Sequence, residues 1–350
     1  MSENTSKQFF PALTSFRAFV AWMIFFYHFF PFKNPNIPLF IKNIVSQFHI
    51  GVDLFFVLSG FLITYRYFND APIHFKKYLI NRFSRIYPMY FLLTTAAFLV
   101  KFFQQGWTTL DSWAAVFSFT LTKALFTTFR YSGISQGWTL TFEELFYFSA
   151  PLFFMIIRKY RKAIYLLPIA IFLCTLGIQN LFHHPENTYG FLQTRIAVFI
   201  FEFFAGILAG YLLLHKKLKF DFNIFTYLGI AGILFYLLFR QFWQHLITNP
   251  FSDALDIILL STLGIGPTIY GLATEKTKLS RFLSHKTLIL LGKSSYIFYL
   301  VHKGFIPIFI YDHIVANVLA IFVILNILSV ILFKFIEEPL NLWIRKKYAK

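Results

Sequence analysis

The sequence predicts an all-α polytopic membrane protein with about ten transmembrane helices and with both termini in the cytoplasm. Of the 350 residues, 57% are hydrophobic and only 13% are charged, which excludes a soluble domain of this length. The apolar runs are about 20 residues long and do not alternate with polar residues, so they favour helices over a β-barrel. Basic residues occur in every second connection, which indicates the orientation.

Ten apolar stretches are long enough to be interpreted as membrane spans. They cover approximately residues 9–31, 48–66, 86–105, 138–157, 163–181, 194–214, 223–243, 254–274, 287–309 and 314–335. The stretch 112–127 is also apolar, but it contains Thr120, Thr122 and Lys123. We interpret it as a re-entrant or interfacial helix. If it crossed the membrane, the count would be eleven and the C-terminus would change sides.

Lysine and arginine are concentrated in alternate connections, as expected for cytoplasmic loops. They are frequent in 67–85, 158–162, 215–222, 275–286 and the tail, and absent from 182–193, 244–253 and 310–313. This distribution accounts for most of the formal net charge of +17, so no nucleic-acid partner is needed to explain it. We expect a single transmembrane domain over 1–340, followed by a short basic cytoplasmic tail at 341–350.

The first span carries two ionisable residues, Arg17 and His28. They are eleven residues apart, which places both on one helix face about 16 Å apart along the axis. An arginine at the centre of a span costs about 2.5–3.5 kcal/mol, so its presence needs a reason. We interpret the two residues as one polar stripe that lines a cavity. The alternative is that Arg17 extends to the nearer interface and His28 only ends the helix.

Three more ionisable residues are predicted in the outer half of other spans: Asp53, Glu143 and His302. Intramembrane ionisable groups normally face a cavity and pair with one another, so we expect these three and His28 to form one cluster. Each also has a structural interpretation, as a helix cap, a hydrogen-bonding post or an interfacial residue. Gly60, seven residues after Asp53 on the same face, would allow another helix or a ligand to approach closely.

The predicted cytoplasmic end of the third span carries a different pattern. Arg82 and Arg85 lie one turn apart in the stretch NRFSRIYP. Arginines at this spacing can bind phosphate oxygens through paired hydrogen bonds, although an ordinary cytoplasmic anchor has the same composition. The one cysteine, Cys174, excludes an intrachain disulfide and a cysteine-based metal site. We expect no metal site.

Six stretches, taken in order, resemble acyltransferase family three, the integral membrane O-acyltransferases of bacterial surface glycans. They are LTSFRA (13–18) followed by Tyr27-His28, GVDLFFVLSG (51–60), NRFSRIYP (81–88), WTLTFEELFY (138–147), SYIFYLVH (295–302) and FIEEPL (335–340). The departures are Thr139, where the family often has serine, and Ser15-Phe16, where it often has glycine and leucine. Neither departure changes a titratable group.

The resemblance implies a multi-pass acyltransferase of the bacterial cytoplasmic membrane. Such an enzyme takes an acyl group, usually acetyl, from cytoplasmic acyl-CoA and transfers it to a hydroxyl group at the outer face. Acyl-CoA is then a donor substrate, and no permanently bound cofactor is implied. The resemblance also implies that His28 is the functional histidine and Arg17 its partner. It associates Arg82 and Arg85 with the donor, and Glu143 is the glutamate of the tryptophan-containing motif.

We expect the donor phosphates to bind at the arginine pair and the thioester to pass Arg17 and reach His28. A neutral imidazole with a reference pKa of about 6.5 is suited to take a proton from a sugar hydroxyl. Asp53 or Glu143 would orient the imidazole. A covalent acyl-enzyme on His28 is the other possibility.

The remaining expected contacts concern the two substrates. The oxyanion of the transfer needs a hydrogen-bond donor, for which Arg17, Tyr147 and Tyr299 are equal candidates. Trp138, Tyr147, Tyr299 and His302 are expected to contact the substrates.

Two alternatives stay open at this point. A transporter of a lipid-linked sugar or an anion could use the buried His, Asp and Glu residues as a proton relay. The cytoplasmic arginine pair together with Arg17 favours a large phosphate-bearing donor instead. The other large family of membrane acyltransferases with a functional histidine lacks support from the motif order. The sequence leaves the acceptor open between a surface polysaccharide and a lipid-linked sugar.

Overall fold

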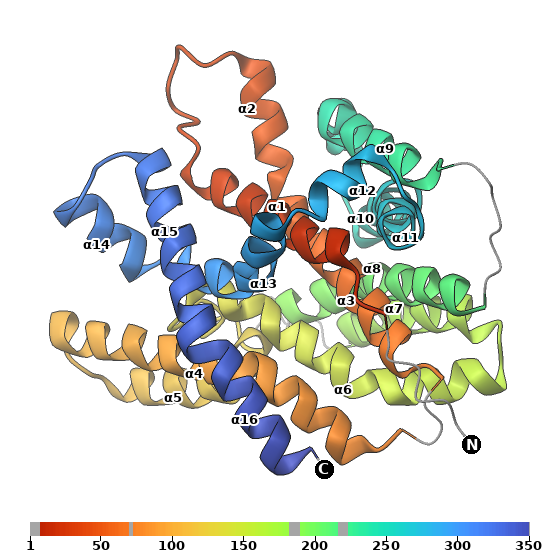
Figure 1. The fold of residues 1–350 in the computed structure, drawn as a ribbon, viewed down its shortest axis with the longest axis horizontal. Coiled ribbons are helices and arrows are strands. Elements are labelled where there is room, and N and C mark those ends of the chain that lie inside the picture. The colour runs from red at the N-terminus through yellow and green to blue at the C-terminus, as the bar shows by residue number, and fades with distance from the viewer. Residues whose placement is uncertain (1–7, 70–72, 182–189, 216–222, 350) are drawn as a thin grey trace.

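The computed structural model describes residues 8–69, 73–181, 190–215 and 223–349, and these ranges contain helices and turns but no strand. Figure 1 shows the helices as one bundle around a centre formed by α1, α3 and α13. The α-helices are α1 (Pro11–Phe29), α2 (Leu39–Ser46), α3 (Gly51–Tyr67), α4 (Phe75–Gln105), α5 (Thr109–Phe119), α6 (Trp138–Lys159), α7 (Ala163–Leu181), α8 (Gly190–Leu214), α9 (Phe225–Phe239), α10 (Pro250–Leu259), α11 (Gly266–Thr274), α12 (Lys278–Leu283), α13 (Lys286–Val301), α14 (Phe305–His313), α15 (Val318–Leu332) and α16 (Glu338–Tyr348).

The prediction of a multi-pass membrane protein is confirmed by the length and composition of the helices. Among the described residues, seven segments are long and apolar enough to cross a membrane. They are Pro11–Phe29, Leu39–Tyr67, Phe75–Gln105, Ser135–Lys159, Phe225–Phe242, Phe251–Thr274 and Val318–Tyr348. Each corresponds to a predicted span, and α7 and α8 add shorter apolar stretches. The count of ten and the cytoplasmic location of the termini stay predictions.

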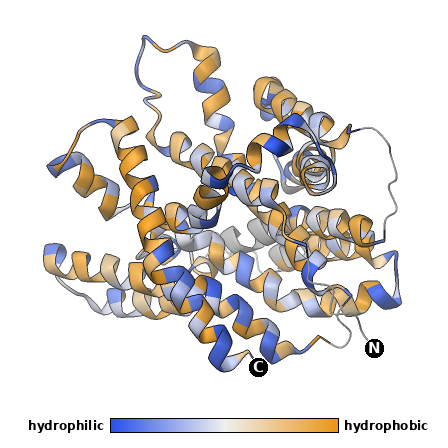
Figure 2. Cartoon of the chain, viewed as in Figure 1, coloured by the Kyte–Doolittle hydropathy of each residue, from blue (hydrophilic) through white to orange (hydrophobic). Residues whose placement is uncertain are grey.

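The outer surface of the bundle is strongly hydrophobic, as contact with lipid requires. Phe103 and Phe335 are 80% and 75% exposed, which would be unfavourable in water for side chains of this size. Figure 2 shows hydrophobic residues along most helices and a concentration of hydrophilic residues at the beginning of α4 and the end of α16. The polar ends of these two helices therefore lie on one side of the bundle (Figures 1 and 2).

The predicted continuous span 287–309 is wrong. The helix α13 ends at Val301, and Gly304 has a φ of 98°, a left-handed conformation that favours glycine. The chain therefore leaves the helix axis before α14 begins at Phe305. In contrast, α15 continues into α16 through a π-helical turn at Phe333–Glu337.

The structure of the ambiguous stretch 112–127 agrees with its interpretation as a segment that does not span the membrane. The helix α5 has 11 residues, so it is about 16 Å long and covers only about half of a hydrocarbon core. The chain turns after it, where Leu121 has a φ of 57°. The buried Lys123 then donates hydrogen bonds to the carbonyl oxygens of Ser132 and Ile134, which attaches this segment to the beginning of α6.

Close helix contacts fix the position of α1, α3 and α13. A Cβ atom on Gly60 would lie 2.1 Å from the carbonyl oxygen of Phe203, so α3 packs directly against the backbone of α8. The predicted role of Gly60 in close helix approach is confirmed. A Cβ atom on Gly292 would lie 1.9 Å from the carbonyl oxygen of Thr14, which brings α13 equally close to α1.

Candidate active site

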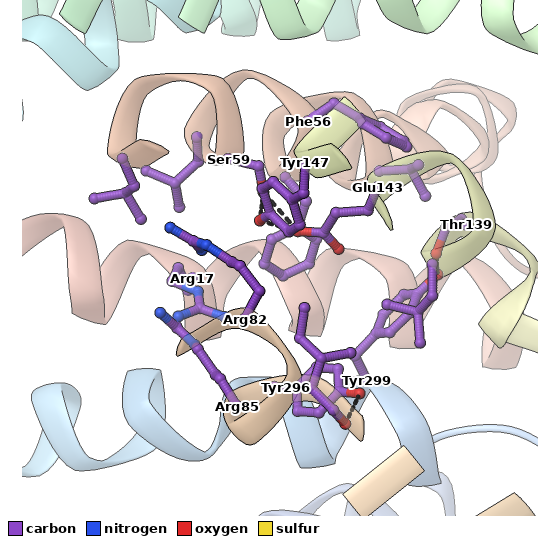
Figure 3. Close-up of a pocket in the computed structure, with 16 residues that line it drawn as sticks. Arg17, Phe56, Ser59, Arg82, Arg85, Thr139, Glu143, Tyr147, Tyr296 and Tyr299 are labelled. Atoms are coloured by element: carbon purple, nitrogen blue, oxygen red, sulfur yellow. Dashed lines mark hydrogen bonds between the residues drawn. The ribbon is translucent and has the colours of Figure 1, made fainter. Parts of the chain in front are cut away.

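A cavity of about 70 Å³ lies between α1, α3, α4, α6 and α13, and is called the inner cavity below. Its apolar walls come mainly from α3, whose residues Val52, Phe55, Phe56 and Leu62 face it. Figure 3 shows the polar side chains that converge on it from all five helices. These polar residues are Arg17, Ser59, Arg82, Arg85, Thr139, Glu143, Tyr147, Tyr296 and Tyr299.

A second cavity of about 370 Å³, the mouth, adjoins the inner cavity. Arg17, Arg82 and Arg85 line both, so these arginines stand at the boundary between the two spaces. Gln8 at the beginning of the described chain and Arg345 on α16 both line the mouth. Residues near the two ends of the described chain therefore border the same opening.

The three arginines form a strongly positive group. Arg82 is only 8% exposed, and its Nε atom has no hydrogen-bond partner. Within the described ranges, none of the three forms an ion pair of 4.0 Å or less with a carboxylate. Glu337 of the mouth is near enough for electrostatic attraction to Arg17 and Arg85, but it does not pair with them. Glu143 is likewise within electrostatic range of Arg17 and Arg82. Three positive charges therefore face two carboxylates, and the net positive charge suits an anionic ligand.

Aromatic rings and the last helix hold the arginines of α4 in place. The guanidinium group of Arg82 lies over the ring of Tyr147 at 4.7 Å and over that of Tyr67 at 5.7 Å. On either side of Arg82, hydrogen bonds join α4 to α16. Asn81 accepts from the Nε atom of Arg345 at 3.0 Å, and Ser84 donates to the side chain of Asn341 at 3.1 Å. The beginning of α4 is therefore braced by α16.

Glu143 forms a hydrogen-bonded cluster with Ser59 and Tyr147. Its Oε1 atom accepts from Ser59 Oγ at 2.7 Å and from the Tyr147 hydroxyl group. The Tyr147 and Ser59 oxygens are 3.0 Å apart. Because Tyr147 also lies under Arg82, the cluster connects directly with the arginine group (Figure 3). Thr139, Glu143 and Tyr147 recur at four-residue intervals on one face of α6, and all three line the inner cavity.

Tyr299 and Thr139 form the wall of the inner cavity farthest from the arginines (Figure 3). Their hydroxyl oxygens are 2.8 Å apart, and the Tyr299 hydroxyl donates to the carbonyl oxygen of Gln136 at 3.0 Å. Gln136 in turn donates from its side chain to the carbonyl oxygen of Leu300. This network fastens the beginning of α6 to the end of α13.

His28 and His302 form a pair of stacked rings, with centroids 5.4 Å apart and an angle of 25° between the planes. His302 is fully buried, and its Nδ1 atom lies 2.7 Å from the carbonyl oxygen of Tyr299. A carbonyl oxygen can only accept, so Nδ1 carries the proton and Nε2 is left as an acceptor. In the part of the chain that the structure describes, this buried Nε2 atom has no hydrogen-bond partner. His28 is exposed and lines neither cavity.

The expected single cluster of His28, Asp53, Glu143 and His302 is therefore not formed. Two members stack on one another, and Glu143 faces the inner cavity with other partners. Asp53 is buried, does not line the inner cavity and lies within electrostatic range of Tyr236 on α9. The position of Asp53 follows from Gly60, because both lie on the face of α3 that is directed away from the cavity.

Trp138 also differs from its expected position at the substrates. It does not line the inner cavity, and its ring stacks on Phe199 of α8 with centroids 6.0 Å apart. Ser59 and Tyr296 are the polar cavity residues that the sequence did not single out. Tyr296 donates to the carbonyl oxygen of Ile86 at 2.8 Å. The spacing of Ser59 could have identified it, because it is a polar residue on the same helix face as Val52 and Phe56.

The fold and these sites define an integral membrane protein with an anion-binding cavity and a carboxylate–hydroxyl cluster beside it. The comparison with known families specifies the class further. The acyltransferase domain of family three matches residues 10–336, nearly the whole chain. The protein belongs to this acyltransferase family.

Three relatives illustrate the similarity. The chain is 27% identical to the O-acetyltransferase OatA of Staphylococcus aureus over 99% of its length, and 24% identical to the putative peptidoglycan O-acetyltransferase YrhL of Bacillus subtilis over 95%. It is 30% identical over 45% of its length to the putative acetyltransferase ORF330 of the Acidianus two-tailed virus. The chain spans 58%, 55% and 46% of these three proteins, respectively. No solved structure matches the chain at a significant level.

Proposed function

We propose that this membrane acyltransferase is an O-acetyltransferase that uses cytoplasmic acetyl-CoA as its donor. The observation that carries the proposal is the group of Arg17, Arg82 and Arg85, which faces both cavities and, among the described residues, has no carboxylate within ion-pair distance. Planar guanidinium groups bind phosphate oxygens through paired, charge-assisted hydrogen bonds. In this arrangement the nucleotide part of the donor occupies the larger mouth. The small volume of the inner cavity favours a short acyl group.

The acceptor in this proposal is a hydroxyl group of a cell-surface glycan or a lipid-linked sugar on the outer side. The printed names of the relatives OatA and YrhL support O-acetylation, and that of YrhL includes peptidoglycan. His28 is exposed in the last turn of α1, eleven residues after Arg17. Its imidazole is suited to remove a proton from such a hydroxyl. Its stacking partner His302 fixes the ring.

Binding of acetyl-CoA to the protein in nanodiscs tests the donor. We expect the double variant Arg82→Gln/Arg85→Gln to bind at least about 100-fold more weakly, since charge-assisted hydrogen bonds are worth about 1.5–3 kcal/mol each. Acetate and acetyl-pantetheine, which lack the nucleotide, should bind poorly to the wild type.

Two controls make the result specific. Arg281→Gln changes an exposed arginine of α12 outside both cavities and should bind as the wild type does. The thermal unfolding of the double variant is measured in the absence of donor, so that lost binding is distinguished from lost folding. Equal binding by the double variant and the wild type would contradict the proposed donor site.

A further inference from the structure

Ser59 of α3 is half-buried, and its hydroxyl group does not bond within its own helix. Ser295 and Ser329 each donate to a carbonyl oxygen of their own helix, the usual arrangement for a serine inside a helix. Ser59 Oγ instead donates to a carboxylate on another helix, Glu143 Oε1, at 2.7 Å. The bond lies on the wall of the inner cavity (Figure 3). A hydroxyl group that donates to a carboxylate is prepared to lose its proton when it attacks an electrophile.

The surroundings of Ser59 supply the other groups that an acyl transfer needs. The Tyr147 hydroxyl lies 3.0 Å from Ser59 Oγ and can donate to an oxyanion that forms there. Arg82 lies over the ring of Tyr147, so the positive charge is directly beside this point. The inner cavity that Ser59 lines adjoins the mouth, so a donor whose phosphates bind in the mouth can extend its acyl end toward Ser59.

The two histidines are separated from this space. His28 lines neither cavity, and the ring of Tyr299, which is in the wall of the inner cavity, contacts the ring of His302 with centroids 5.5 Å apart. Direct transfer would require this wall to be open while the donor and the acceptor are both bound. A covalent carrier on the cavity side removes the need for both substrates to be present at once.

We propose that Ser59 is the nucleophile that accepts the acyl group from the donor and forms an acyl-serine intermediate. This proposal rests on the proposed function. The Ser59 hydroxyl transfers its proton to the Glu143 carboxylate while Oγ forms a bond to the thioester carbonyl carbon. The carbon–sulfur bond breaks, and the CoA thiolate leaves with the proton from Glu143. In the second step the pair of Thr139 and Tyr299 separates and an acceptor hydroxyl from the side of His28 attacks the same carbonyl carbon. The ester bond to Ser59 breaks, and the proton of the acceptor passes through His28 to Ser59 Oγ.

The first step is tested without any acceptor. The protein in nanodiscs is mixed with acetyl-CoA, quenched with acid and digested, and the peptide that contains Ser59 is examined by mass spectrometry. In parallel, exchange of acetyl between acetyl-CoA and isotopically labelled CoA is followed. We expect the wild type to carry one acetyl group on Ser59 and to catalyse the exchange.

Variants of Ser59 test whether this residue carries the acetyl group. Ser59→Ala should lose both the adduct and the exchange and keep its affinity for acetyl-CoA within about twofold, because the arginine group is unchanged. Ser59→Cys should give an adduct that neutral hydroxylamine removes, as expected for a thioester. Ser149→Ala, on the same helix as Glu143, is the matched control and should behave as the wild type, since Ser149 donates to the carbonyl oxygen of Leu145.

Three outcomes would overturn the acyl-serine. They are exchange at the wild-type rate by Ser59→Ala, an adduct on another residue, or a wild type that binds acetyl-CoA but shows neither adduct nor exchange. Binding of acetyl-CoA without adduct or exchange would support acetyl-CoA as the donor and exclude Ser59 as a covalent carrier of the acyl group. A wild type that does not bind acetyl-CoA would contradict the proposed function itself, so the two failures are distinguishable.

Discussion

At the scale of single residues, Tyr147 combines two contacts that can be separated by mutation. Its ring supports the guanidinium group of Arg82 at 4.7 Å, and its hydroxyl group donates to Glu143. The ring contact stabilises the donor-binding arginine through a cation–π interaction of about 0.5–2 kcal/mol. The hydroxyl contact belongs to the chemical step. Binding and chemistry are therefore expected to respond differently to changes in this one side chain.

Tyr147→Phe keeps the ring and removes the hydroxyl group. We expect acetyl-CoA affinity close to that of the wild type and an exchange rate lower by about 10–100-fold, as for loss of a hydrogen bond to a charged group. Tyr147→Leu removes the ring as well and should also weaken acetyl-CoA binding. The measurements are the dissociation constant and the exchange rate of both variants. Equal losses of affinity in both variants would show that the hydroxyl group acts in binding.

The sequence predicted the arginines and Glu143 correctly as lining residues but not the partners of Glu143. The missing information was the orientation of α3. Val52, Phe56 and Ser59 recur at intervals of four and three residues, which places them on one helix face, and all three line the inner cavity. Asp53 shares a face with Gly60 instead, and that face packs against α8. Asp53 was singled out in the sequence because it is charged, whereas Ser59 is a neutral residue within an apolar stretch.

At the scale of elements, α3 forms one wall of the inner cavity and packs against α8 on its other side. The contact with α8 is backbone to backbone, because a Cβ atom at Gly60 would be only 2.1 Å from the carbonyl oxygen of Phe203. Any increase in this separation moves Ser59 relative to Glu143. The small residue therefore fixes the geometry of a site that it does not touch.

Gly60→Ala should destabilise the protein by about 1–3 kcal/mol or more, the range of overpacked core substitutions. The matched control is Gly177→Ala on α7, where an added Cβ atom meets nothing within 4 Å. This variant should be neutral or more stable by about 0.5–1 kcal/mol, because alanine is the better helix former. Thermal unfolding in the same detergent compares the two. Similar unfolding temperatures for both variants would contradict the close packing of α3 and α8.

The elements were predicted best where a long apolar run has no internal break. The helix α1 is such a case, since Pro11–Phe29 lies within two residues of the predicted span 9–31 at each end, whereas α15 continues through a π-helical turn into α16, past the predicted end at 335. The end of α13 was predicted worst, because hydrophobicity continues through Ile306 and Ile308 after the helix has ended at Val301. The break depends on the backbone conformation of Gly304, which hydrophobicity does not encode.

At the scale of the whole molecule, two polar sites lie on opposite sides of the wall made by Thr139 and Tyr299. The arginine group and the cluster around Glu143 are reached through the mouth, which both described ends of the chain border. The stacked histidines lie beyond the wall, with His28 exposed. This separation suits a reaction in two steps, in which each side of the protein handles one substrate.

His28→Ala tests whether the two sites handle separate steps. The variant should lose transfer of labelled acetyl to the glycan fraction of membranes, because no general base is left for the acceptor hydroxyl; such a base contributes about 100–10,000-fold. It should retain exchange between acetyl-CoA and labelled CoA, since His28 lines neither cavity. His313→Ala is the control, an exposed histidine at the end of α14 whose loss should affect neither reaction. Loss of exchange in His28→Ala would place His28 in the donor step. The wall would then have to open before the donor reacts, and the thioester would have to reach beyond Tyr299.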